Sequence, residues 1–159
     1  MTKRIIAACV ALGFAIPAAA DDRLVRFDGG VGVIPTGSGN TTTRGVPAAG
    51  QIWVISRLSA EVRTDARISV EGRGLLLAAG NNVGTNGGQS VRARLFCGAA
   101  GAEVAFDSAT VPLEPNGDFR IDGELANANA ALPPTCERPV LLILNGGGTA
   151  WFAAAFPKL

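Results

Sequence analysis

The chain has 159 residues, with 14 lysines and arginines against 13 aspartates and glutamates, and it contains no histidine. This length suffices for one domain with a substantial core. The near-neutral charge gives no electrostatic basis for binding nucleic acid or an anionic membrane surface. The lack of histidine excludes Ser-His-Asp and Cys-His nucleophilic sites, histidine-containing zinc sites and histidine-based pH switches.

Residues 1–20 have the three zones of a secretory signal peptide. A Lys-Arg pair at 3–4 forms the positive zone, residues 5–16 form the apolar zone, and residues 17–20 supply a helix-breaking proline and a small-residue cleavage pattern. The apolar zone is too short to cross a bilayer, which takes about 20 residues. We therefore expect a cleaved leader, a single domain at 21–159 without a membrane span, and a secreted or periplasmic location.

Cleavage of this leader removes Cys9 and two basic residues, which leaves 12 basic residues against 13 acids and two cysteines, Cys97 and Cys136. An even pair has one possible connectivity, and an oxidising compartment favours the bridge. We therefore expect a structural Cys97–Cys136 disulfide. A redox-active pair is the alternative, but such pairs are closely spaced and lie at a helix N-terminus that stabilises the thiolate.

The predicted elements begin, in chain order, with short strand candidates at 24–27 and 52–55. Residues 57–73 then alternate apolar and polar side chains on both sides of a turn at 64–67. A period of two predicts strands rather than helices. This segment is therefore expected to form an antiparallel hairpin with one solvated face.

Residues 90–97 repeat the alternation and predict a further strand. The clearest hairpin joins 111–113 to 119–124 through Asn116 and Gly117. Asn-Gly is the dipeptide that most readily supplies the positive φ angles of a tight turn. The sequence therefore predicts a close antiparallel pair at this point.

Two apolar segments complete the chain: a continuous run at 140–144, typical of a central strand buried on both sides, and a last strand at 151–156. Eight or nine short strands without an amphipathic helix predict an all-β domain. We expect a single antiparallel β-sandwich with Greek-key connections and immunoglobulin-like architecture. A small β-barrel is the alternative. The chain has no tyrosine, and so it lacks the tyrosine corner of the immunoglobulin superfamily.

Three carboxylates, Asp118, Asp122 and Glu124, are expected on one face of the strand at 119–124. Residues two apart on a strand lie about 6.5–7 Å apart, and paired carboxylates can hydrolyse glycosidic bonds. Arg120 lies between them, as on a solvated sheet surface with ion pairs. An EF-hand calcium loop takes oxygen ligands from three alternate positions, and here Arg120 occupies the middle one. We therefore assign no catalytic residue and no metal site.

The loop at 80–89 is rich in glycine, asparagine and glutamine. It leads into a strand and not into a helix, so it does not form a phosphate-binding loop; the same holds for the glycine-rich segment at 37–40. Loops carried on a rigid scaffold commonly hold function, and amide side chains suit hydrogen bonds to sugars or to peptide backbone. The candidate binding residues are Asn81, Asn82, Asn86 and Gln89.

Several segments resemble small exported bacterial proteins to which no function is assigned. They are RISVEGRGLLL at 67–77, GTNGGQSVRARLFC at 84–97, PNGDFRID at 115–122, PVLLI at 139–143 and WFA at 151–153. The resemblance implies a common secreted fold, and it implies no activity, ligand or catalytic residue.

From the sequence we therefore expect an exported, non-catalytic β-sandwich that serves as a binding or cell-envelope interaction module without a cofactor. Its partner is expected to be a cell-envelope protein or a glycan. Two alternatives stay open: a carboxylate-based glycan hydrolase, and a calcium-dependent adhesion or stress protein.

Overall fold

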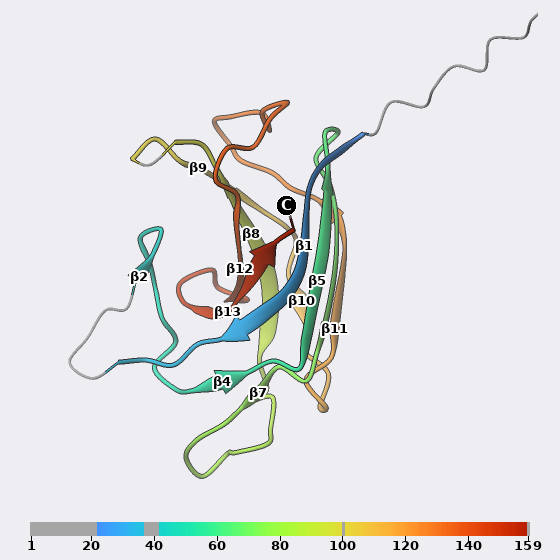
Figure 1. Ribbon diagram of the computed structural model, residues 1–159. Coiled ribbons are helices and arrows are strands. Elements are labelled where there is room, and N and C mark those ends of the chain that lie inside the picture. Colours follow the sequence, from blue (N-terminus) through green and yellow to red (C-terminus); the bar gives the residue numbers. More distant parts are fainter. Residues whose placement is uncertain (1–21, 37–41, 100, 159) are drawn as a thin grey trace, which may run out of the picture.

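The computed structural model describes residues 22–36, 42–99 and 101–158 (Figure 1). The predicted leader at 1–20 and the glycine-rich segment at 37–40 lie outside these residues. The described ranges contain no helix. They contain thirteen strands: β1 (Arg23–Gly32), β2 (Thr42–Thr43), β3 (Val46–Pro47), β4 (Trp53–Val54), β5 (Arg57–Arg63), β6 (Arg67–Arg73), β7 (Leu76–Leu77), β8 (Ser90–Cys97), β9 (Val104–Asp107), β10 (Val111–Pro112), β11 (Phe119–Glu124), β12 (Val140–Asn145) and β13 (Trp151–Pro157).

Nine of the strands form one antiparallel sheet in the order β10–β8–β12–β13–β1–β5–β6–β11, with β9 pairing with β8. The sheet curls, so that β1, β5 and β11 lie on one side and β8, β12 and β13 on the other (Figure 1). A bridge between Asp107 and Ala126 joins its two ends. The predicted all-β antiparallel domain is confirmed, and its continuous curled sheet comes close to the barrel alternative.

The strands from β8 onward follow a Greek-key path. β9 and β10 pair with successive parts of β8, β11 follows beside them, and β12 returns to lie on the other side of β8. This is the order in which the fourth strand lies beside the first. Two small sheets, β2–β3 and β4–β7, lie outside the main sheet.

The inward side chains of β5, β6 and β11 meet in matched rows across the sheet. Leu58, Gly72 and Phe119 form one row, and Val70 pairs with Ile121 in the next. Gly72 has no side chain, and the Phe119 ring occupies the space beside it; a Cβ at Gly72 would overlap that ring. The core packing of these three strands therefore depends on the fit between Gly72 and Phe119.

Strand β12 is buried on both faces, as its apolar run predicts. Residues 141–144 are all fully buried. The β2–β3 hairpin runs along the outer side of this part of the sheet: the Ala49 N–H donates to the Trp151 carbonyl oxygen at one end, and Arg44 forms an ion pair with Glu103 at the other. A strand that is covered on both faces typically has a continuous apolar sequence.

The predicted disulfide joins Cys97, the last residue of β8, to Cys136 in the long connection between β11 and β12. The two Cα atoms are 4.8 Å apart, within the usual range for a bridge. Next to it, the Gly98 N–H donates to the Glu137 carbonyl oxygen at 3.0 Å. The disulfide therefore ties the connection between β11 and β12 to β8, the strand with which β12 pairs.

The predicted hairpin turn is present, but only one of its two central residues has a positive φ. Gly117 has φ 81°, whereas Asn116 contributes through its side chain, whose Oδ1 accepts the Asp118 N–H at 3.0 Å. The turn is closed by the Glu114 N–H donating to the Asp118 carbonyl oxygen at 2.9 Å. A Cβ at Gly117 would lie 2.6 Å from the Leu75 backbone nitrogen, so close packing as well as φ requires glycine here.

Candidate functional site

The loop between β7 and β8 carries the four side chains proposed from the sequence. Its first half folds back onto β7, because the Leu77 N–H donates to the Thr85 carbonyl oxygen and the Gly84 N–H donates to that of Leu77. Gly87 and Gly88 then turn the chain with φ 59° and 64°. The glycine content therefore serves the path of the loop.

Asn86 anchors this loop to the neighbouring hairpin. Its Nδ2 donates to the carbonyl oxygens of Leu113 at 2.7 Å and Glu114 at 3.1 Å, and its Oδ1 accepts the Gly88 N–H at 2.9 Å. Both ends of the amide are thus engaged within the fold. Asn81 lies in the exposed part of the loop, away from any concave surface formed by the other candidates.

The other two candidates, Asn82 and Gln89, line a hollow of about 350 Å³ together with residues from distant segments. Its lining includes Trp53 and Phe152, which we call its floor; their rings are stacked with centroids 4.2 Å apart, and both residues are nearly buried. We call this surface the amide hollow and define it by Gln51, Asn82, Gln89 and Asn145 around Trp53 and Phe152.

Each element of the fold brings one part of the amide hollow into place. Trp53 belongs to β4, which crosses the end of β1 through a hydrogen bond from the Trp53 N–H to the Val33 carbonyl oxygen at 2.9 Å. Phe152 belongs to β13, and Leu77 of β7 pairs with Trp53. The floor is therefore held by regular strands, while the rim is carried by loops and by the end of β12.

The amide side chains of the rim differ in how far the protein itself uses them. Asn145 is engaged in its own turn, where Oδ1 accepts the Thr149 N–H at 2.8 Å and Nδ2 donates to Thr149 Oγ1 at 3.0 Å. Gln89 makes one long hydrogen bond from Nε2 to the Gly87 carbonyl oxygen at 3.3 Å. Within the described ranges, the side chains of Gln51 and Asn82 make none. The hollow thus offers unused amide donors and acceptors above an aromatic floor, and no charged residue lines it.

Sequence reasoning found Asn82 and Gln89 but missed Gln51 and Asn145. Both lie next to apolar strands and carry no motif of their own. The stacking of Trp53 on Phe152 joins positions far apart in the chain, and no local pattern reveals it. A polar amide at or just before the end of a buried apolar strand is the weak signal that was present.

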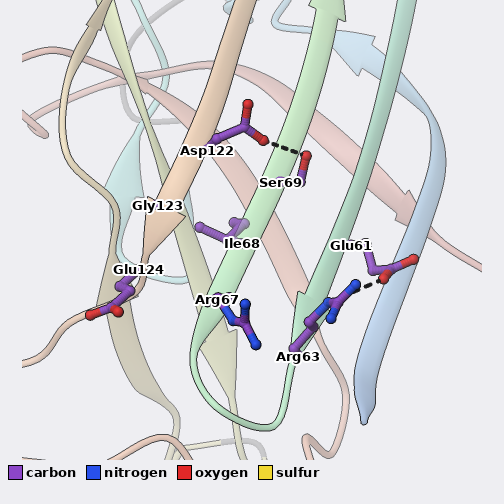
Figure 2. Close-up of a pocket in the computed structure, with 8 residues that line it drawn as sticks. All are labelled: Glu61, Arg63, Arg67, Ile68, Ser69, Asp122, Gly123 and Glu124. Atoms are coloured by element: carbon purple, nitrogen blue, oxygen red, sulfur yellow. Dashed lines mark hydrogen bonds and ion pairs between the residues drawn. The ribbon is translucent and has the colours of Figure 1, made fainter. Parts of the chain in front are cut away.

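A second concave surface lies on the outer side of β5, β6 and β11 (Figure 2). It encloses about 540 Å³. We call it the charged wall and define it by Glu61, Arg63, Arg67, Ser69, Asp122 and Glu124.

Most of the charges on this wall are paired, either within the wall or with a neighbouring side chain. Asp122 accepts a hydrogen bond from Ser69 Oγ at 2.8 Å and also pairs with Arg120, and Glu61 lies 3.7 Å from Arg63 (Figure 2). Paired, exposed charges of this kind are what an ordinary solvated sheet surface carries. The wall therefore offers a ligand fewer unused polar groups than the amide hollow does.

The carboxylates of the predicted hydrolase alternative have structural partners. Hydrogen bonds from Arg120 and then Ser69 lower the pKa of Asp122 below its usual 3.8, whereas a general acid needs a raised pKa. Asp118 accepts the Gly74 N–H at 3.0 Å and a hydrogen bond from Asn116 Nδ2 at 3.1 Å, so it holds the β10–β11 turn against β6. Neither carboxylate is placed as a proton donor.

Acid is expected to destabilise the strands that carry the charged wall and the turn between β5 and β6. Asp65, Glu71 and Asp122 each accept a hydrogen bond from an arginine two positions away, which lowers the pKa of each carboxyl below its ordinary 3.8 or 4.5. A pKa that is lower in the folded state adds stability above the unfolded pKa, and this stability is lost as the pH falls toward the folded pKa. The melting temperature, followed by circular dichroism, should stay level from pH 7 to about 5 and fall between about pH 4.5 and 3.

Salt provides the control for this prediction, because exposed ion pairs are screened. At high sodium chloride concentration the fall in melting temperature should become shallower. A melting temperature that is unchanged from pH 5 to pH 3 at low salt would contradict the assignment of these pairs.

Among the described residues, no group of three or more histidine, cysteine, aspartate or glutamate side chains is placed to hold a metal ion. The part of the chain that the structure describes also has no helix that could span a membrane. Comparison of the chain with protein-family models, curated proteins and solved structures finds no match. The resemblance to small exported bacterial proteins therefore stays a prediction, and the site must be argued from its own geometry.

Proposed function

We propose that this protein is an exported, non-catalytic binding module of the cell envelope and that the amide hollow is its ligand site. One observation carries the proposal: unpaired amide side chains of Gln51 and Asn82 surround an aromatic floor in a concave surface without charge. Ligand sites are typically concave and largely apolar, with a few polar groups that fix orientation. The Cys97–Cys136 disulfide supports an oxidising compartment and hence export.

The rigidity of the scaffold supports binding at this position. Trp53 and Phe152 are fixed by strands and are 4 % and 5 % exposed. Asn86 and the backbone hydrogen bonds of the β7–β8 loop hold this part of the rim in place. A preformed rim loses little conformational entropy when a ligand binds, which raises affinity for a given set of contacts.

The experiment is a binding assay with an insoluble cell-envelope fraction from the expression host as the probe. The protein is purified from the periplasm of that host and sedimented with the fraction. We expect saturable binding that is weakened in a triple variant, Gln51→Ala, Asn82→Ala and Gln89→Ala. Removing three hydrogen-bonding groups at about 0.5–1.5 kcal/mol each should weaken binding by about tenfold or more.

The matched control is a triple variant of the charged wall, Glu61→Gln, Ser69→Ala and Glu124→Gln, whose binding should equal that of the wild type. Melting curves of both variants establish that each is folded. Equal loss of binding in the two variants, or no saturable binding by the wild type, would refute the proposed site.

A further inference from the structure

We propose that the amide hollow binds a neutral sugar unit, a mono- or disaccharide portion of a glycan, through hydroxyl–amide hydrogen bonds. This inference rests on the proposed function and names the ligand class of the same site. Three features of the hollow support it: the type of polar group at the rim, the lack of charge, and the hydrogen bonds already made by the surrounding backbone.

The polar groups of the rim match sugar hydroxyls. An amide side chain carries a donor and an acceptor, and a hydroxyl group also donates and accepts, so one amide can make two hydrogen bonds to neighbouring hydroxyls. Gln51 and Asn82 are free to do so, and Gln89 leaves its Oε1 unused by described residues. The C–H face of a sugar ring is apolar, and it suits the apolar part of the lining, which includes Leu77 and Ala150 as well as the nearly buried Trp53 and Phe152.

The lack of charge selects against acidic and phosphorylated ligands. No arginine, lysine, aspartate or glutamate lines the hollow. A carboxylate or phosphate transferred into it would lose water without gaining an opposite charge, which is costly. A neutral ring meets no such penalty, because its hydroxyl groups regain hydrogen bonds from the amides.

The hydrogen bonding of the backbone around the hollow argues against a peptide ligand. An extended peptide is usually bound by main-chain groups of an open strand edge. At the hollow the N–H groups of the strand residues are already used, since Trp53 donates to the Val33 carbonyl oxygen and Leu77 donates to that of Thr85. What the hollow offers is therefore side-chain amides, which suit a ring bearing hydroxyl groups better than a strand.

The size of the hollow sets the size of the ligand. Its volume of about 350 Å³ lies at the lower end of the range of roughly 300–1,000 Å³ found for ligand sites. It is an open surface feature and not an enclosed cavity, so a longer glycan can extend into solvent from the bound unit. One or two sugar rings are therefore expected to make the specific contacts.

The experiment measures equilibrium binding of the periplasmically purified protein to an array of neutral hexose and N-acetylhexosamine oligosaccharides, followed by calorimetry with the best binder. D-glucuronate-containing oligosaccharides and end-blocked trialanine are the charged and peptide probes. We expect saturable binding of at least one neutral saccharide. Gln51→Ala and Asn82→Ala should each weaken it by about 2- to 10-fold, since each removes one hydrogen-bonding side chain.

Asn81→Ala is the matched control, because Asn81 neighbours Asn82 in the same exposed loop but does not line the hollow. Its dissociation constant should equal that of the wild type. Absence of binding to every neutral saccharide, tighter binding of the charged or peptide probe, or an equal effect of Asn81→Ala and Asn82→Ala would overturn the inference. If binding to the envelope fraction depends on the hollow while no neutral saccharide competes, the sugar inference fails and the proposed function stands.

Discussion

Removal of the Cys97–Cys136 disulfide is expected to lower the free energy of unfolding by about 4 kcal/mol. The bridge joins residues separated by 39 positions and encloses β9, β10 and β11 together with the crossover to β12. Without it, the unfolded chain gains the entropy of an open loop of this length. The double variant Cys97→Ala and Cys136→Ala is measured by urea unfolding and should also melt about 10 °C lower.

Reduction of the wild-type protein provides an independent route to the same state. Reduced wild type and the double variant should unfold at similar urea concentrations, because both lack the cross-link while the remaining strands are unchanged. A loss below about 1 kcal/mol would contradict the account, since it would mean that the bridge does not constrain the unfolded chain. The proposed location in an oxidising compartment explains why the protein can depend on this bond.

The second large effect is expected at the contact between Gly72 and Phe119. Phe119→Ala should cost about 3–5 kcal/mol, because it removes a nearly buried aromatic side chain and leaves a cavity in the wall of the sheet. Gly72→Ala should also destabilise the protein, by about 1–3 kcal/mol, because the added Cβ would overlap the Phe119 ring. Gly72 has no positive φ, so alanine is compatible with the backbone there.

The two substitutions should therefore be strongly non-additive. In the Phe119→Ala protein the ring is gone, so Gly72→Ala should lower the free energy of unfolding little or should raise it. Alanine is more favourable than glycine inside a strand. A double-mutant cycle from urea unfolding measures the coupling, which we expect to be about 1–3 kcal/mol. Additive effects would show that the Phe119 ring does not fill the space beside Gly72.

Most of the longer strands of this fold are predictable because one face of each is solvated, and β12 is predictable because its apolar run is continuous. The alternation at 57–73 and 90–97 gives β5, β6 and β8 close to their observed bounds, and the apolar run at 140–144 gives β12. The short strands β2, β3, β7 and β9 escaped prediction. They contain too few residues to show a period, and their pairing is determined by tertiary neighbours rather than by local pattern.

The closure of the sheet and the location of the hollow were harder to predict for the same reason. Asp107 and Ala126 form the bridge between the two ends of the sheet, and nothing in their local sequence indicates it. Asn82 and Asn86 belong to the same asparagine-rich loop, yet Asn86 serves the fold while Asn82 faces the hollow. Composition identified the loop, and only the three-dimensional path of the chain separates the two roles.

The hydrolase and calcium alternatives depend on surfaces that the structure describes in detail. Asp122 is held as a carboxylate by Arg120 and Ser69, and Asp118 holds the hairpin turn in place. Both acids are thus engaged in contacts that hold the sheet and its turn together, and the lowered pKa of Asp122 is the opposite of what a general acid needs. The binding function therefore has the stronger physical support.

The most direct test of the amide hollow as the ligand site is NMR of the ¹⁵N-labelled protein during titration with solubilised cell-envelope glycan. The side-chain NH2 signals of Gln51, Asn82 and Gln89 and the indole N–H signal of Trp53 report on the hollow itself. We predict that these signals shift in a saturable way while that of Asn81 does not. Shifts confined to the arginines of the charged wall, or no shift at the hollow, would contradict the account.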